Sequence, residues 1–106
     1  MAYPTIAIGS VENLYSRMMH FKNAGDVEQG HAHQYNHLTL LAHGSLKVVV
    51  NGQETNFVAP NMIFIKEGEE HELTALEDNT VAYCIHALRT DSKENCIISP
   101  EMMPNY

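Results

Sequence analysis

The sequence of 106 residues has few basic side chains. Its 6 Lys and Arg stand against 13 Asp and Glu, which gives a formal net charge of −7 with His neutral. Phosphate-backbone binding depends on clusters of Lys and Arg, so this composition argues against a nucleic-acid partner. No apolar run approaches the roughly 20 residues of a membrane-spanning helix, and the N-terminus lacks the basic and apolar regions of a signal peptide. We therefore expect a cytoplasmic protein without a membrane or nucleic-acid partner.

Cysteine is also scarce, with only Cys84 and Cys96. A single disulfide between them stays open, but Cys84 lies in the apolar run 81–85, where a reduced core thiol is the commoner outcome. The sequence offers no Ser-His-Asp or Cys-His nucleophile arrangement and no phosphate-cradling glycine loop that can be assembled from its motifs. We assign no catalytic side chain from the sequence.

Short apolar runs bounded by turn residues are plentiful. With 44% hydrophobic residues the chain can bury a core, and its length suits one domain spanning 1–106. Asn51-Gly52 predicts a type I′ hairpin turn, because both central residues of that turn need positive φ. Many short strands without a long helix predict an all-β sandwich or barrel, with residues 90–106 as a C-terminal arm. The expected strands are 5–8, 14–21, 38–42, 46–50, 53–58, 62–65, 72–76 and 81–88. The first is expected to end at Gly9-Ser10, and a helix over 11–20 is the alternative to the second.

Several of these strands are apolar on both faces, notably 38–42, 48–50 and 63–65. A sheet that faces water on one side should alternate between apolar and polar residues, so the outer face must be covered as well. A second subunit would cover it, and two-fold dimers are the commonest assembly, so we expect a homodimer. The alternative is cover by the chain's own first strand or tail.

Three of the seven histidines lie within seven residues, at His31, His33 and His37. Residues i and i+2 of a strand share a face, so His31 and His33 can direct two imidazoles at one point, and the polar residues 34–36 can return the chain to bring in His37. A cluster of this kind indicates a metal site, although a polar loop with scattered histidines is the simpler alternative. His71 is the candidate partner from elsewhere, because it follows the turn 66–70, where Gly68 permits a tight approach and unusual backbone dihedrals.

These residues resemble the cupin family. Its first motif, Gly-x5-His-x-His-x3-4-Glu-x6-Gly, is matched in spacing by Gly25, His31, His33, position 37 and Gly44, with His37 in place of Glu. Its second motif, Gly-x5-Pro-x-Gly-x2-His-x3-Asn, is matched by Gly68 and His71, whereas Pro60, Lys66 and Ala75 replace the usual Gly, Pro and Asn. The matched region, 25–75, covers about half the chain.

The resemblance implies a jelly-roll β-barrel (double-stranded β-helix) with one divalent metal in its mouth, held by His31, His33, His37 and His71. With four neutral donors the ion keeps its full charge, and imidazole suits Fe, Ni, Cu or Zn, with Mn also open. Six-coordination would leave two adjacent positions for water, dioxygen or a chelating small molecule. A three-histidine site, with His37 turned away, is the alternative.

The resemblance further implies a metal-dependent oxidoreductase of the dioxygenase type, acting on a small enolisable or diketone-like compound. A non-enzymatic metal-containing binding protein and a metal-assisted isomerase or lyase are the alternatives, since fold alone does not decide function. The remaining histidines are not expected to bind the metal. His20 and His86 lie in apolar strands and can line the cavity, and His43 is expected to be structural or exposed.

Overall fold

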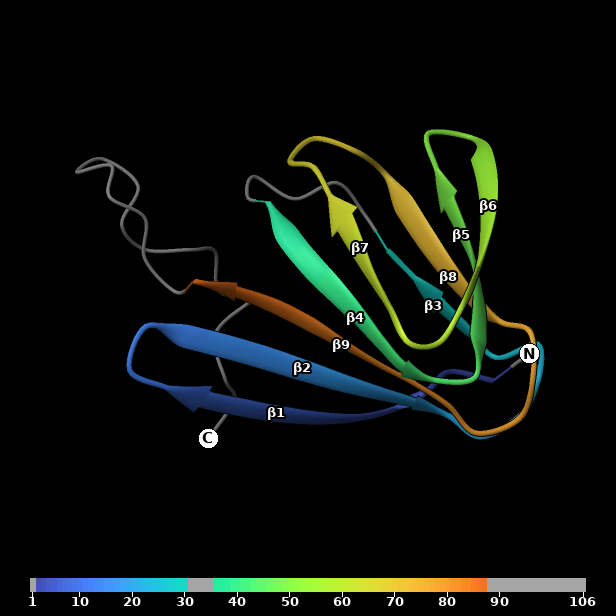
Figure 1. Ribbon diagram of the computed structural model, residues 1–106, viewed down its shortest axis with the longest axis horizontal. Coiled ribbons are helices and arrows are strands. Elements are labelled where there is room, and N and C mark those ends of the chain that lie inside the picture. The colour runs from blue at the N-terminus through green and yellow to red at the C-terminus, as the bar shows by residue number, and fades with distance from the viewer. Residues whose placement is uncertain (1, 31–35, 88–106) are drawn as a thin grey trace.

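The computed structural model describes residues 2–30 and 36–87. These residues form nine β-strands in two sheets (Figure 1). No helix in this part of the chain is long and apolar enough to cross a membrane. The strands are β1 (Thr5–Val11), β2 (Leu14–Phe21), β3 (Val27–Gln29), β4 (His37–His43), β5 (Ser45–Val50), β6 (Gln53–Val58), β7 (Asn61–Ile65), β8 (His71–Ala75) and β9 (Thr80–Ala87).

The larger sheet has the strand order β1-β2-β9-β4-β7, and the smaller sheet has the order β3-β8-β5-β6. All neighbouring strands in both sheets are antiparallel. The chain crosses repeatedly between the sheets, so that β4 and β8, which carry two of the predicted ligands, lie in different sheets. The expected all-β sandwich or barrel is confirmed.

Local sequence explains most of the strand boundaries. The Asn51-Gly52 hairpin forms as predicted, with φ of 49° and 84° at its two central residues. The helix alternative over 11–20 is wrong, because this segment pairs as β2 with both β1 and β9. The expected end of the first strand at Gly9 is also wrong. Gly9 pairs opposite Ser16 inside the ladder, and the hairpin turns at Glu12, whose φ is 55°.

The side chains that face the interior form layers, because residues directly opposite in an antiparallel pair share a face. The first inner layer contains Tyr15, His86 and His37 from the larger sheet and His71 and Val50 from the smaller one. The second inner layer contains Arg17, Cys84, Thr39 and Ile63, with Glu28, Leu73 and Val48 opposite. Below them Met19, Ala82, Leu41, Leu46 and Ala75 belong to the apolar core. The buried histidines and the Arg17–Glu28 pair therefore lie in the first two layers, whereas the third layer is apolar.

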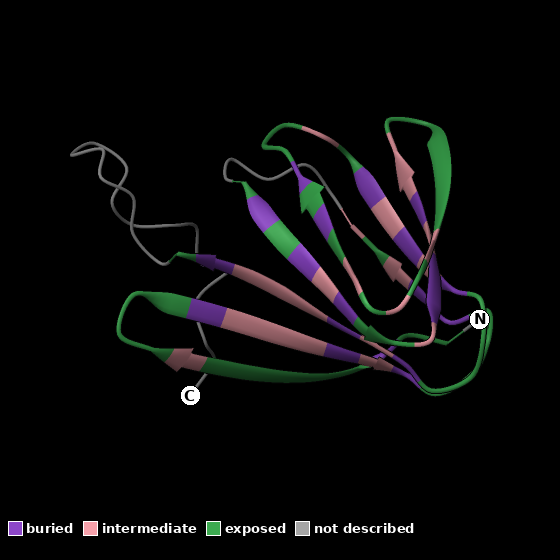
Figure 2. Cartoon of the chain, viewed as in Figure 1, coloured by how far each residue is buried: buried purple, intermediate pink, exposed green. Residues whose placement is uncertain are grey.

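The outer face of the larger sheet is apolar where β4 and β7 pair, as expected. Leu38 lies opposite Phe64, and Leu40 lies opposite Met62. Met62 and Phe64 are 56% and 59% exposed, and the exposed parts of both strands are visible in Figure 2. The first strand does not cover this face, because β1 pairs edge to edge with β2 in the same sheet.

Candidate metal centre

His37 and His71 come together at the open end of the barrel. Each is the first residue of its strand, β4 or β8, and they are only 5% and 8% exposed. Their ring centroids lie 5.2 Å apart, with an angle of 53° between the ring planes. Two imidazoles bound to one ion at about 2.0–2.1 Å place their ring centres roughly 4.5–5.3 Å apart for N–metal–N angles of about 90–110°. The spacing of this pair therefore fits a shared metal ion, and His37 does not turn away from His71.

The turn before β8 sets the orientation of the His71 ring. Its Nδ1 lies 3.4 Å from the carbonyl oxygen of Glu69, which can only accept, so this contact favours the tautomer that carries its proton on Nδ1. The turn itself is closed by a hydrogen bond from the Lys66 amide to the Glu69 carboxylate (3.0 Å). Gly68 adopts the predicted positive φ of 83°, but the predicted tight approach is wrong, since a Cβ there would meet nothing within 4 Å.

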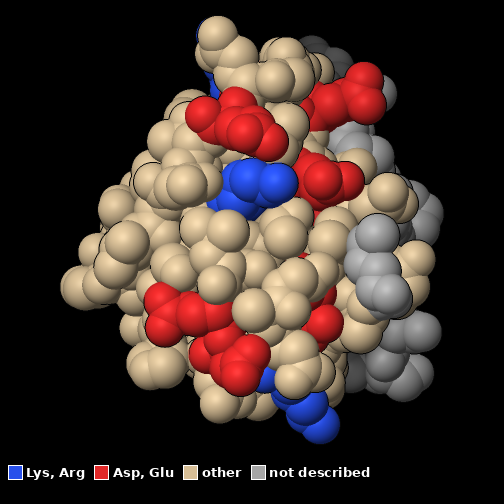
Figure 3. Space-filling view, turned by 90° about the vertical axis from the view of Figure 1, so that its right-hand side faces the viewer, with Lys and Arg blue, Asp and Glu red and all other residues tan. Residues whose placement is uncertain are grey.

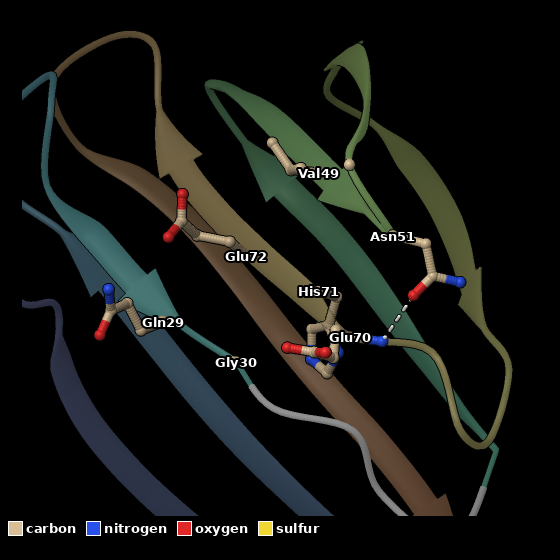
Figure 4. Close-up of a pocket in the computed structure, with 8 residues that line it drawn as sticks. Gln29, Gly30, Val49, Asn51, Glu70, His71 and Glu72 are labelled. Atoms are coloured by element: carbon tan, nitrogen blue, oxygen red, sulfur yellow. Dashed lines mark hydrogen bonds between the residues drawn. The ribbon is translucent and has the colours of Figure 1, made fainter.

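The β5–β6 hairpin supports the same turn. The side chain of Asn51 accepts a hydrogen bond from the Glu70 amide (3.1 Å, Figure 4), and the Asn51 amide donates to the Glu70 carbonyl (2.9 Å). Both bonds are made by the backbone of Glu70, the residue that precedes His71. The predicted hairpin thus also positions the strand that carries His71.

The close approach that we expected at Gly68 occurs at Gly30 instead. A Cβ at Gly30 would lie 2.2 Å from the His71 carbonyl oxygen and 2.8 Å from Cδ2 and Nε2 of its ring. On the far side of residues 31–35, Asn36 accepts a hydrogen bond from the Glu67 amide (2.8 Å), and His37 follows. Both ends of the segment that carries His31 and His33 are therefore held beside His71 and the turn before it.

His31 and His33 themselves lie outside the described residues. Within residues 2–30 and 36–87, no three His, Cys, Asp or Glu side chains group together as a metal site. The structure thus brings together two of the four predicted ligands and fixes both ends of the segment that holds the other two.

The three other histidines occupy different positions. His43 is exposed beyond a register shift in β4, and its Nδ1 lies 2.7 Å from the Asn79 carbonyl oxygen, as expected for a structural surface residue. His20 faces outwards, with its Nε2 3.1 Å from the Asn79 side chain. His86 is buried in the first inner layer and stacks on Tyr15 at 4.7 Å between centroids. Burial lowers the pKa of His86, and a hydrogen bond to the Ala87 carbonyl opposes that shift.

Polar groups in the second inner layer are functional candidates that sequence reasoning missed. The Arg17 guanidinium contacts the Glu28 carboxylate at 2.6 Å and joins the two sheets. Cys84 is a free thiol 3.6 Å from the Thr39 hydroxyl, and burial raises the pKa of this thiol. Strand parity could have found Arg17, because it lies between Tyr15 and Met19 on the buried face of β2.

Two cavities lie near the histidine pair, and His71 lines one of them. The first, of about 370 Å³, opens between the sheets and is lined by interior apolar residues such as Val50, Ile63 and Ile65. Ile65 pairs with His37 and Val50 pairs with His71, so the strand neighbours of both histidines line this cavity. The second, of about 490 Å³, lies outside the smaller sheet between Gln29, Asn51 and Glu72 and reaches the other side of His71 (Figure 4).

The surface is mainly acidic, in keeping with the net charge. In Figure 3, carboxylates are spread over the face shown, with few basic groups among them. Lys47 is one described basic residue, and it lies 3.6 Å from Glu54. Arg17 and Glu28 form an ion pair inside the barrel, whereas Lys47 and Glu54 form theirs on the surface.

The comparisons with known proteins agree with this architecture. The sequence matches no protein-family model and no curated protein. The structure is similar to KdgF from Halomonas sp., with 16% identity, 81% of this chain and 79% of that chain covered, and a TM-score of 0.65. It is similar to a cupin 2 conserved barrel domain protein from Salinispora arenicola (14%, 77% and 73%, TM-score 0.68) and to the Cnp3 cupin domain from Schizosaccharomyces pombe (15%, 77% and 62%, TM-score 0.67).

These likenesses define the class of fold as an all-β, double-stranded β-helix. The chain has the cupin fold, as the two sequence motifs implied.

Proposed function

We propose that His31, His33, His37 and His71 hold one divalent transition metal, and that the protein is a dioxygenase-type oxidoreductase for a small enolisable or diketone-like molecule. The observation that carries the proposal is the convergence of His37 and His71 from different sheets, with ring centroids 5.2 Å apart. When bound, Fe, Mn, Ni, Cu or Zn would supply a Lewis-acidic centre, and the redox-active members could also engage dioxygen.

The residues of the chain would prepare this site in three ways. The Glu69 carbonyl oxygen favours the His71 tautomer with its proton on Nδ1, in which Nε2 would bind the metal. Gly30, the residue that precedes His31 in the sequence, lets the backbone approach the His71 ring. Apolar side chains such as Ile63, Ile65 and Val50 line the nearby cavity and would contact the carbon skeleton of a chelating substrate.

Metal content and oxygen consumption test the proposal separately. Elemental analysis of purified protein should give one transition metal per chain, and His37→Ala should reduce that stoichiometry. His43→Ala is the matched control, because His43 lies in the same strand but is exposed and bonds to Asn79. Unchanged metal content in the His37 variant would contradict the four-histidine site and leave the three-histidine alternative.

Oxygen uptake by Fe- or Mn-loaded protein across a panel of β-diketones, flavonols and thiols tests the reaction. Uptake that disappears in His71→Ala supports the oxidoreductase. Tight binding of these compounds without oxygen uptake would instead identify a metal-containing binding protein. Conversion without oxygen uptake would identify an isomerase or lyase.

We also propose that the outer face of the larger sheet forms a homodimer interface. Its support is the apolar pairing of Leu38 with Phe64 and of Leu40 with Met62, with two of these side chains more than half exposed. Light scattering should give a dimer mass, and Phe64→Asp should give a monomer. Val58→Asp, at a still more exposed apolar residue of the smaller sheet, is the control. A clean monomer for the unmodified chain would refute the interface.

The free thiol of Cys84 supports a reducing, cytoplasmic location.

A further inference from the structure

The second inner layer contains an ion pair between the two sheets. Arg17 projects inwards from β2, since it pairs with Cys84, whose thiol contacts the inward-facing Thr39. Glu28 projects inwards from β3, since it pairs with the buried Leu73. The two charged groups meet at 2.6 Å, and their side chains remain 29% and 21% exposed. Solvent therefore reaches this pair although both side chains point into the barrel.

We propose that Arg17 is an anion anchor that binds the carboxylate of a small ligand whose other end chelates the metal. This inference rests on the proposed function, because it assumes a metal at His37 and His71. It adds the class of ligand: a metal chelator that bears a carboxylate at its far end. Glu28 orients the guanidinium, and a ligand carboxylate takes the remaining donors.

The chemistry of the guanidinium supports this role. The contact with Glu28 is made by Nη1, whereas a guanidinium has five N–H donors in a planar fork that suits bidentate carboxylate binding. A partly buried ion pair is also weak evidence for a stabilising role, because desolvation offsets much of the attraction. Burial raises the pKa of both Tyr15 and Cys84, so these neighbours are neutral near pH 7 and do not compete for Arg17.

The spacing of the layers sets the size of the ligand. Arg17 lies two residues from Tyr15 along β2, so the second inner layer is roughly 7 Å below the first at about 3.4 Å per residue. A rigid chelator with a carboxylate roughly this far from its metal-binding oxygens spans the two layers. 3,4-Dihydroxybenzoate has this form, and catechol is the same chelator without the carboxylate.

The test compares these two probes on Ni²⁺-loaded protein by titration calorimetry. We expect the unmodified chain to bind 3,4-dihydroxybenzoate about tenfold to hundredfold more tightly than catechol, as for a charge-assisted hydrogen bond. Arg17→Met should abolish this preference while leaving catechol binding unchanged. Glu28→Gln should increase the preference, because the amide oxygen can still accept from the guanidinium and orient it, while the negative charge that repels a ligand carboxylate is removed.

A double variant, Arg17→Met with Glu28→Met, covers the case in which a single change prevents folding, since it leaves no unpaired interior charge. It too should bind both probes equally. Equal affinity of the unmodified chain for both probes would overturn the anchor and leave the metal site intact. A purely structural role of the pair would leave the probe preference the same in all variants, which also overturns the anchor. If neither probe binds Ni²⁺-loaded protein, the metal has no open positions for a chelating ligand, and both proposals are refuted.

Discussion

Gly30→Ala tests how closely the segment before His31 must approach His71. The added Cβ would lie 2.2 Å from the His71 carbonyl oxygen, where an ordinary contact is about 3.5 Å, so the backbone of β3 or β8 must move by more than about 1 Å. Overpacking of this kind costs about 1–3 kcal/mol. For a domain of about this size, that lowers the melting temperature by about 4 °C or more. The same Cβ would also lie 2.8 Å from Nε2, the atom that we assign to the metal.

Two measurements separate the structural effect from the effect on the metal. Thermal unfolding of metal-free protein gives the cost of the clash, and metal titration gives the loss of affinity. Gly9→Ala is the matched control, because Gly9 also lies in a strand but a Cβ there meets nothing within 4 Å. Equal melting temperatures for the two variants would refute the close approach. A destabilised Gly30→Ala with unchanged metal affinity would refute the link between this approach and the metal.

Three further predictions concern single side chains. Burial lowers the pKa of His86, so the His86 imidazole binds a proton more readily in the unfolded chain than in the folded one. The free energy of unfolding should therefore be constant above about pH 6.5 and decrease as the pH falls towards the lowered pKa. Chemical unfolding at several pH values should show a smaller acid loss in His86→Phe than in the unmodified chain, whereas an equal loss would contradict the assignment. Asn51→Gly keeps the positive φ but removes the acceptor for the Glu70 amide, so it should cost about 0.5–1.5 kcal/mol by urea unfolding; no change would mean that this bond adds nothing. In a Cys96→Ser background, Cys84 should react slowly with a disulfide reagent at pH 8 until the protein is unfolded, because burial raises its pKa, and rapid reaction of the folded protein would show that the thiol is accessible.

The sequence predicted the strands and turns well where local chemistry decides the conformation. Asn51-Gly52 favours a two-residue hairpin turn, and this turn sets the register in which β5 pairs with β6. The end of β1 was missed because a glycine was read as a terminator, although pairing with β2 carries the strand past Gly9 to Val11. Tertiary pairing thus overrode a local turn signal.

The candidate site could be predicted only in part. Motif spacing identified His37 and His71, which the fold brings together from different sheets. The interior ion pair was missed because Arg17 and Glu28 come from strands of opposite sheets, and no sequence spacing shows that they meet. The role of His86 was also undecided, since its stacking on Tyr15 depends on the pairing of β2 with β9.

The layered interior has a consequence for engineering. Histidines that could hold an ion occupy one layer, whereas Arg17, Glu28, Thr39 and Cys84 occupy the next, two residues away along each strand. Because residues two apart along a strand occupy different layers, the second layer can be varied while the histidines of the first are kept, in those variants that still fold. Under the proposed function, a small combinatorial library at these four positions would vary ligand preference while the histidine layer stays unchanged.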